Sequence, residues 1–316
     1  MEKGLRKHVV IASALSSVAF LGFVFSFLRF SKPNGAASDW MGNLDDGAAL
    51  TSLSIPGSHD SGALHSVADL SGKCQDATIA EQLSYGVRFF DVRLRYEKSA
   101  LFVYHGFINE GMSFSELLSP MYSFLKEHPK ECLLLSAKKE NLSDSSSMFE
   151  AALKNEIAKN SSFWLTASTL PETLGASRGK ILLISRYDGT SIGIDASAAS
   201  GWLDPKEASS ANTFTIDKAT KIRVQDHYKL LDNETKWSEA TALLSEASAS
   251  TDPKTLYLNF FSGYLTKGFP PSYSLTTAKV INPRILKELP DSHKGVLIVD
   301  FVTKDLVKKL LEGNPT

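Results

Sequence analysis

The chain has few cysteines and none of the sequence patterns that bind structural zinc or nucleotides. It contains two cysteines, Cys74 and Cys132, and none of its seven histidines lies in a Cys/His cluster with zinc spacing. No GxGxxG or GxxxxGKS loop follows an apolar run, which disfavours a nucleotide-binding open sheet. The two cysteines either form one disulfide or are unrelated thiols, because the sequence cannot show whether their Cα atoms meet.

An excess of charge of one sign is also absent. The 34 basic and 35 acidic side chains leave a formal net charge of -1, so no strong field is available to attract nucleic acid. We therefore expect no nucleic-acid partner, and we expect a monomer. With 316 residues, of which 43% are hydrophobic, the chain is long enough for one large core or for a barrel of about 250 residues.

The long apolar run of this sequence lies near its N-terminus. Residues 9–28 contain no charge, proline or asparagine, and basic residues lie on both sides of them. As a helix they would span about 30 Å, the thickness of the hydrocarbon core of a bilayer. We predict that residues 1–37 form a cytosolic stub, an apolar helix that is a signal-anchor or a signal peptide, and a linker. A retained helix implies a membrane-anchored protein with a lumenal or extracellular body, and a cleaved helix implies a secreted one.

Short apolar runs alternate with helical patterns in the rest of the chain. Strands are predicted at residues 51–55, 89–94, 101–104, 132–136, 181–185, 222–224, 255–260 and 296–301. Helices are predicted at residues 78–85, 114–128, 146–159, 238–248 and 283–288. Repeated strand and helix units favour a parallel sheet covered by helices. We therefore predict that residues 38–316 form one α/β domain, a distorted or incomplete TIM (β/α)8 barrel, with a doubly wound open sheet as the alternative.

Charged and polar side chains gather at or just past the C-terminal ends of the predicted strands. They are His59, Arg93, His105, Lys138, Arg186, Asp226 and Asp300. Barrel active sites are built at these strand ends. Buried charge is costly there without a ligand or partner, so the set indicates a site more strongly than any one member does. His128 and His293 lie in polar turns and are interpreted as solvated histidines.

Two imidazoles and one guanidinium are enough to break a phosphodiester without a metal. One imidazole removes a proton from the attacking hydroxyl, and the other donates a proton to the leaving oxygen. The guanidinium stabilises the negative charge that develops on the phosphate. The segments around His59, Arg93 and His105 supply this set of groups.

The motifs around these residues follow one another along the chain. They include Leu53-Ser54-Ile55-Pro56-Gly57-Ser58-His59-Asp60-Ser61-Gly62, Gly86-Val87-Arg88-Phe89-Phe90-Asp91-Val92-Arg93, Tyr104-His105-Gly106, Ser136-Ala137-Lys138-Lys139-Glu140 and Val224-Gln225-Asp226-His227-Tyr228. From about Trp40 to Phe301 the chain resembles the X domain of phosphatidylinositol-specific phospholipase C, in its bacterial, calcium-independent form. The resemblance implies a distorted TIM barrel.

The resemblance also implies roles for the residues of the site. His59 would be the general base on the inositol 2-hydroxyl, and Asp300 would orient it. His105 would be the general acid for the glycerol oxygen, coupled to Asp60. The residues that match those holding the inositol ring and its hydroxyls are Lys138, Arg186, Asp226 and Tyr228.

By the same resemblance, Arg93 would grip the phosphate, with Asp91 nearby. Because Arg93 lies two positions after Asp91, the pair is a poor calcium site, and we expect neither a metal nor a cofactor. The expected substrate is phosphatidylinositol or a glycosylated form of it at a membrane surface, with diacylglycerol and an inositol cyclic phosphate as products. The alternatives are a metal-dependent barrel phosphodiesterase, of the glycerophosphodiester or sphingomyelinase D kind, and a non-catalytic inositol-lipid-binding module.

Overall fold

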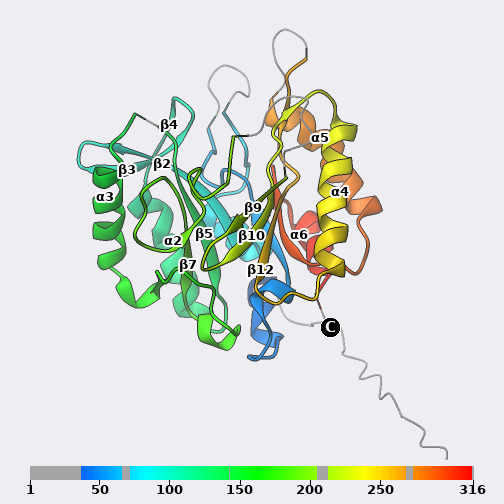
Figure 1. The fold of residues 1–316 in the computed structure, drawn as a ribbon, viewed down its shortest axis with the longest axis horizontal. Helices are drawn as coiled ribbons and strands as arrows, with labels where there is room; N and C mark the ends of the chain where they lie inside the picture. Colours follow the sequence, from blue (N-terminus) through cyan, green and yellow to red (C-terminus); the bar gives the residue numbers. More distant parts are fainter. Residues whose placement is uncertain (1–36, 66–71, 142, 205–212, 268–272, 315–316) are drawn as a thin grey trace, which may run out of the picture.

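The computed structural model describes residues 37–65, 72–141, 143–204, 213–267 and 273–314 (Figure 1). Its strands are β1 (Ser54–Ser58), β2 (Phe89–Glu97), β3 (Ala100–His105), β4 (Ile108–Ser113), β5 (Leu133–Lys139), β6 (Trp164–Leu165), β7 (Ile181–Arg186), β8 (Ile194–Asp195), β9 (Thr213–Asp217), β10 (Lys221–Gln225), β11 (Lys229–Leu230), β12 (Thr255–Phe260), β13 (Tyr264–Leu265) and β14 (Gly295–Val299). Its α-helices are α1 (Ile79–Tyr85), α2 (Phe114–Glu127), α3 (Ser146–Ala158), α4 (Asn233–Ala249), α5 (Ser274–Glu288) and α6 (Lys304–Leu311).

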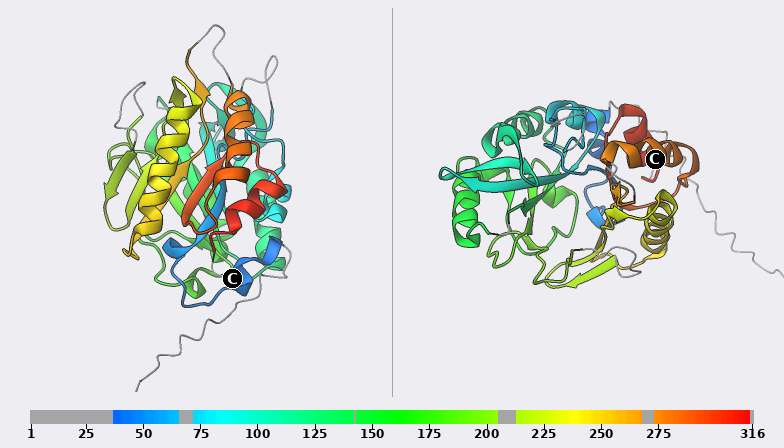
Figure 2. Two further views of the ribbon diagram at one scale, coloured as in Figure 1. Left: turned by 90° about the vertical axis from the view of Figure 1, so that its right-hand side faces the viewer. Right: turned by 90° about the horizontal axis from the view of Figure 1, so that it is seen from above.

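The main sheet is parallel through most of its width and curls around a central space. Its order is β6-β7-β5-β2-β1-β14-β12-β10-β9, with β9 antiparallel to β10. Seen from above in Figure 2, the strands enclose the barrel interior and the helices lie outside them. No ladder joins β7 to β10 within the described ranges, so the barrel is open on that side.

The predicted α/β architecture with an incomplete barrel is confirmed, but one of the eight predicted strands lies outside the barrel wall. Residues 101–104 belong to β3, which pairs antiparallel with β2 and with β4 in a side hairpin instead of joining the barrel wall. The first strand begins at Ser54 because residues 50–52 form a 3-10 turn. Helix α6, which packs against β1 and α5, was not predicted.

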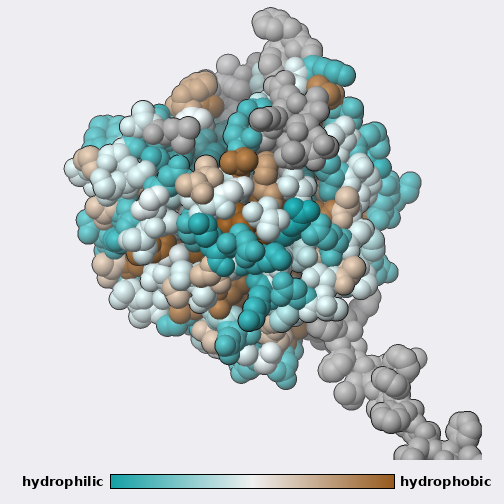
Figure 3. Space-filling model, viewed as in Figure 1, coloured by the Kyte–Doolittle hydropathy of each residue, from teal (hydrophilic) through white to brown (hydrophobic). Residues whose placement is uncertain are grey.

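The predicted membrane anchor requires a correction. Among the residues that the structure describes, none of the helices combines the length and the apolar composition needed to cross a bilayer. Residues 9–28, from which the apolar helix was predicted, lie outside the described part of the chain. On the face seen in Figure 1 the surface is mostly hydrophilic, with hydrophobic side chains in small separate groups (Figure 3). The structure therefore gives no support to an anchored protein.

Strand alternation divides the buried side chains between two cores. Successive residues of a strand point to opposite faces. In β5, Leu133 and Leu135 belong to the core between the sheet and its helices, whereas Leu134 belongs to the core inside the barrel. In β7, Leu182 and Ile184 likewise belong to the inner core. Every second residue of a barrel strand therefore faces the interior, and near the C-terminal ends these residues are polar.

The two cysteines are both free thiols, and each lies in different surroundings. The Sγ atom of Cys132, which precedes β5, is 3.5 Å from the Sδ atom of Met41. The Sγ atom of Cys74 is 3.7 Å from the Oγ atom of Ser274, the first residue of α5. Both side chains are fully buried. Of the two alternatives, unrelated thiols are therefore correct.

Candidate active site

Three basic side chains form a row across neighbouring strands at the open end of the barrel. Arg93 on β2 is the register partner of Lys138 on β5, which is in turn the partner of Arg186 on β7. Each lies an even number of positions after an interior-facing residue of its own strand, as Arg93 does after Phe89 and Lys138 after Leu134. Because side chains alternate between the two faces of a strand, all three point inward. The row places positive charge on one side of the cavity.

Buried carboxylates next to these three basic side chains compensate part of their positive charge. Asp91 is fully buried, with its Oδ1 3.2 Å from Arg186 NH1 and its Oδ2 3.6 Å from Arg93 Nε. Burial alone would raise the pKa of Asp91, but the two guanidinium groups outweigh it and hold that pKa well below its usual value. Asp91 therefore stays ionised and fixes both arginines.

Glu140 is a further carboxylate of the site, and it was not assigned a role from the sequence. Its Oε2 lies 2.9 Å from Lys138 Nζ, and its Oε1 accepts a hydrogen bond from the backbone N–H of Gly106 at 2.9 Å. Burial works to raise the pKa of Glu140, but Arg93 and Lys138 lower it to about 2. Glu140 thus connects the cationic row to the turn that carries His105.

Asp226 and Trp202 hold the far end of the row. Asp226 follows β10, and its Oδ2 is 3.2 Å from Arg186 NH2. The same oxygen accepts a hydrogen bond of 3.0 Å from the indole N–H of Trp202, whose ring lies 3.6 Å from the Arg186 guanidinium carbon. Stacking on an aromatic face and a carboxylate partner together orient this guanidinium.

His59 lies just after β1 and is held from both sides. Its Nδ1 is 2.7 Å from Asp300 Oδ1, so with the carboxylate as acceptor Nδ1 carries the hydrogen and Nε2 presents its lone pair. Arg93 NH2 donates to that Nε2 at 2.7 Å. The amide of Gln75 donates to the carbonyl groups of His59 and Val299, which fixes the backbone on both strands. The basic nitrogen of His59 therefore faces the guanidinium.

His105, the last residue of β3, faces the same space. Its Nδ1 donates to the carbonyl oxygen of Gly72 at 2.6 Å, and its Nε2 lies 3.8 Å from Asp60 Oδ2. Burial and then the positive charge of Arg93 lower the pKa of His105 to about 4. Burial likewise raises the pKa of Asp60 well above its usual value, although Arg93 opposes this. Burial and the positive charge of Arg93 together keep the substrate-free imidazole neutral.

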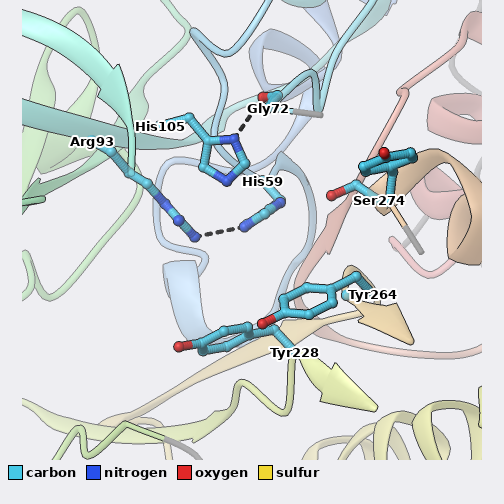
Figure 4. A pocket seen from close by; sticks show the side chains of 9 residues that line it. His59, Gly72, Arg93, His105, Tyr228, Tyr264 and Ser274 are labelled. Carbon is cyan, nitrogen blue, oxygen red and sulfur yellow. Dashed lines mark hydrogen bonds between the residues drawn. The ribbon is translucent and has the colours of Figure 1, made fainter. Parts of the chain in front are cut away.

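One cavity of about 210 Å³ joins these groups. His59, Arg93 and His105 line it together with Tyr228 and Tyr264. In Figure 4 the two imidazoles and the guanidinium face one another across a short gap, and the two tyrosine rings lie below them. The Tyr228 hydroxyl donates to Asp204 Oδ1 at 2.6 Å, and the Tyr228 and Tyr264 ring centroids are 6.1 Å apart. Imidazoles, a guanidinium and an aromatic wall therefore border one space.

The structure brings the ten predicted site residues together around this space. His59, Arg93, His105 and Tyr228 line the cavity, Asp60 and Asp300 contact the two histidines, and the remaining four form the ion-pair network. Sequence reasoning missed several neighbours. These are Gly72, Cys74, Gln75, Glu140, Trp202, Tyr264, Tyr273 and Ser274. Among them, only Glu140 lies in a quoted motif, so its place after Lys138 was the available signal.

Comparison with known proteins gives an independent view of the chain. Residues 49–187 match the family model described as phosphatidylinositol-specific phospholipase C, X domain. The chain is 31% identical over 295 residues to a 1-phosphatidylinositol phosphodiesterase of Staphylococcus aureus (strain Newman), covering 87% of this chain and 94% of that protein. A 1-phosphatidylinositol phosphodiesterase of Listeria monocytogenes is 26% identical, with 93% and 91% covered.

A solved structure shows the same architecture. Phosphatidylinositol-specific phospholipase C from Staphylococcus aureus, from work on modulation of its membrane binding, superimposes with a TM-score of 0.77 at 30% identity. The match covers 89% of this chain and 98% of that one. The curled barrel described above is therefore similar to the TIM-like barrel of a bacterial enzyme.

Proposed function

Because the chain belongs to the phosphatidylinositol-specific phospholipase C family, we propose that it cleaves phosphatidylinositol by general acid and base catalysis without a metal. The observation that carries this proposal is the convergence of His59, Arg93 and His105 on one cavity. Attack of the inositol 2-hydroxyl on phosphorus forms the cyclic phosphate and breaks the bond to the glycerol oxygen. The products are diacylglycerol and an inositol cyclic phosphate.

His59 is the proposed base. Its Nε2 takes the proton of the 2-hydroxyl as that oxygen attacks, and the imidazolium that results is stabilised by Asp300 at Nδ1. In the unliganded site Arg93 donates to this nitrogen. A bound phosphate offers the guanidinium better acceptors than His59 does. Hydrogen bonds between two charged groups are stronger than those from a charged group to a neutral imidazole. Substrate binding therefore frees the base at the moment it is needed.

His105 is the proposed acid, and its protonation follows from the same exchange. An anionic phosphate neutralises the field of Arg93, which is one of the causes of the lowered His105 pKa. The imidazole can then hold the proton that it gives to the glycerol oxygen through Nε2. Asp60, 3.8 Å from that nitrogen, is placed to stabilise the protonated form.

The inositol ring is proposed to lie between the ionic network and Tyr228. Six-membered rings with several hydroxyls present donors and acceptors in many directions, and Lys138, Arg186 and Asp226 offer both kinds of partner. Tyr228 borders the opposite side of the cavity with an aromatic face. A site that bonds hydroxyls in this way discriminates against head groups that lack them.

The position of Arg93 supports metal-free chemistry. Its Nε lies 3.4 Å from Asp60 Oδ2 and 3.6 Å from Asp91 Oδ2, between the carboxylates that a calcium ion would need. The guanidinium thus supplies the positive charge in the place where the metal-dependent alternative would require an ion. This arrangement favours the phospholipase proposal over a metal-dependent barrel phosphodiesterase.

Phe107 supports docking of the open end of the barrel on a membrane. It lies in the turn between β3 and β4, two residues after His105, and 86% of its surface is exposed. An apolar ring beside the cavity can enter the boundary between lipid head groups and acyl chains while the site faces the surface. We propose that the protein acts as a monomer on lipid in the bilayer, either phosphatidylinositol or its glycosylated form.

The test is head-group release from vesicles. The protein is incubated with vesicles that contain phosphatidylinositol, with glycosylated phosphatidylinositol, or with phosphatidylcholine alone, and the water-soluble product is identified by phosphorus NMR. We expect inositol cyclic phosphate from phosphatidylinositol, the same cyclic phosphate still carrying its glycan from the glycosylated lipid, and no release from phosphatidylcholine. Binding to the inositol lipid without any released phosphate would instead support a non-catalytic binding module.

A further inference from the structure

A buried thiol lies directly behind the wall of the catalytic cavity. Cys74 Sγ is 3.7 Å from Ser274 Oγ and 3.9 Å from the carbonyl oxygen of Gly72, and both of these residues line the cavity. The backbone of Cys74 is fixed, because its N–H donates to Ala63 and its carbonyl accepts from Phe301. The thiol therefore keeps its place beside the cavity, and none of the proposed catalytic steps uses it.

Two groups of potential metal ligands share this thiol. The first group is Asp60, Cys74 and His105, each of which contributes one ligand atom, and these three atoms lie within 4.8 Å of one another. The second group is His59, Cys74 and Asp300, whose ligand atoms are equally close. In the second group the His59 and Asp300 side chains are already hydrogen-bonded to each other at 2.7 Å. The first group is the one with free ligand capacity.

Asp60 provides an independent sign of that capacity. Its side chain is fully buried, yet neither carboxylate oxygen makes a hydrogen bond. Its nearest ion-pair partners are Arg93 Nε at 3.4 Å and His105 Nε2, neutral in the free site, at 3.8 Å, and both distances exceed those of a good hydrogen bond. A buried carboxylate in this state calls for a further partner.

We propose that Asp60, Cys74 and His105 form an inhibitory site for a thiophilic divalent cation, with zinc as the best-fitting ion. Zinc takes sulfur, imidazole and carboxylate ligands at about 2.0–2.3 Å in a tetrahedron, which sets the ligand atoms about 3.5 Å apart. Ligand atoms that already lie within 4.8 Å reach this spacing by small side-chain movements. A solvent molecule from the cavity completes the fourth position.

The chemistry of the ligands sets the selectivity. Burial raises the pKa of the Cys74 thiol and of the Asp60 carboxyl, so the ion binds by displacing their protons to solvent. The thiolate and carboxylate that result bring two negative charges, which compensate the ion beside Arg93. Calcium and magnesium prefer oxygen ligands and do not take the thiolate, so they gain little from this site. Soft and borderline ions such as zinc, and cobalt as its spectroscopic substitute, are therefore the ions that bind.

Occupation of the site would stop proton transfer. The ion would take a ring nitrogen of His105 and a carboxylate oxygen of Asp60, which removes the proposed acid and its partner together. This consequence rests on the proposed function, whereas binding of the ion does not. Loss of a general acid costs about 10²–10⁴-fold in rate, so we expect saturating zinc to lower turnover about 100-fold or more. Excess chelator restores the activity.

The experiment measures binding and inhibition separately. Cobalt is titrated into the metal-free protein, and the near-ultraviolet thiolate-to-cobalt charge-transfer band is recorded. The same titration is performed on Cys74→Ser, on Cys74→Ala and on the matched control Cys132→Ser, whose thiol lies against Met41. Inhibition of head-group release by zinc is then measured for all four proteins, with calcium as the control ion.

We expect the band and the zinc inhibition in the wild type and in Cys132→Ser, and their loss in both Cys74 variants, which keep their basal turnover. A wild type without the band overturns the proposal, as does equal zinc inhibition of the Cys74 variants. The two serine variants and the alanine variant are compared by thermal unfolding, so a folding defect is recognised. If the wild type failed to cleave phosphatidylinositol, the cobalt band alone would still decide the question.

Discussion

Two arginines close together in the sequence, Arg88 and Arg93, differ in how completely their side chains are hydrogen-bonded. Arg88, just before β2, donates from Nε to Glu131 at 2.8 Å, from NH1 to the carbonyl groups of Leu83 and Val87, and from NH2 to that of Ser38. Arg93, further along β2, has no hydrogen bond at Nε, and its carboxylate neighbours lie at 3.4–3.6 Å.

The difference in hydrogen bonding distinguishes an arginine that stabilises the fold from one that is available to a ligand. At the closed end of the barrel every side-chain nitrogen of Arg88 donates to a protein acceptor, and the pair with Glu131 is completely buried. At the open end the charges are close but incompletely bonded, which leaves donors available to the oxygens of a ligand. A buried charge with all its bonds made holds the fold, whereas one with bonds left to make is suited to binding a phosphate.

The largest expected effects come from the two histidines of the cavity. We expect His59→Ala and His105→Ala each to lower kcat on phosphatidylinositol by about 10²–10⁴-fold, since each removes one proton transfer. With an inositol phosphate whose leaving group is nitrophenolate, which needs no proton, His105→Ala recovers much of its rate and His59→Ala does not. His128→Ala, whose ring pairs with Asp39 instead, is the control. Equal recovery of both cavity variants would contradict the assignment.

The two arginines provide a matched test of the comparison itself. Arg93→Met is expected to lower kcat by about 10²–10³-fold, because a donor to the transition state is lost, with a small change in stability. Arg88→Met leaves Glu131 buried without its partner, and we expect it to lower the free energy of unfolding by about 3–5 kcal/mol while the folded fraction keeps its kcat. Steady-state kinetics and denaturant unfolding measure both quantities. Similar destabilisation by the two variants would end the distinction.

A smaller change at the same position sharpens the test. Arg93→Lys keeps the charge but replaces a forked donor with a single ammonium group, so it cannot make two parallel bonds to phosphate. We expect kcat to fall more than KM rises. A rise in KM with kcat preserved would show that Arg93 serves only to bind the ground state.

The field of Arg93 is also expected to appear in the titration of His105. In the free protein burial and then the charge of Arg93 lower the pKa of this imidazole to about 4, so the ring is neutral at physiological pH. A bound inositol phosphate offsets the guanidinium charge, and the pKa of His105 should then rise by about 1 unit or more. Histidine NMR in chelator, with and without the phosphate, measures both states. A pKa that stays unchanged or falls would contradict the proposed activation of the acid.

The smallest expected effect is at the exposed turn. Phe107→Ser removes an apolar ring that contributes to membrane binding, and we expect vesicle affinity to fall about tenfold, within the range for burying one such side chain. Turnover of the water-soluble inositol phosphate with a nitrophenolate leaving group should stay unchanged. Vesicle sedimentation measures the first quantity and product release the second. An equal loss in both assays would place Phe107 in the cavity instead of on the membrane.

Much of the site could be predicted because strand periodicity is a local signal. Alternation alone places Asp91 and Arg93 on the inner face of β2, and strand ends gather at one edge of a parallel sheet. The hairpin of β3 and β4 could not be predicted in this way. An apolar run such as residues 101–104 has the same sequence pattern in a barrel wall and in an antiparallel hairpin.

Contacts between distant segments are the part that the sequence could not provide. Cys74 is held beside the site by backbone hydrogen bonds with Ala63 and Phe301, and nothing in its local sequence indicates a catalytic neighbour. His293 was interpreted as solvated, yet it is 2% exposed and bonds the carbonyl oxygens of Pro290 and Leu310. Its polar sequence neighbours do not reveal that α6 covers the ring.

The position of Arg93 among carboxylates is the basis of the metal-free account, and one measurement tests it most directly. Head-group release from phosphatidylinositol vesicles is followed after exhaustive dialysis against EDTA, and again after addition of calcium. We expect full turnover to inositol cyclic phosphate in the chelator and no stimulation by calcium. Turnover that disappears in EDTA and returns with calcium would contradict the account, because the guanidinium would then not be the cation that stabilises the phosphate.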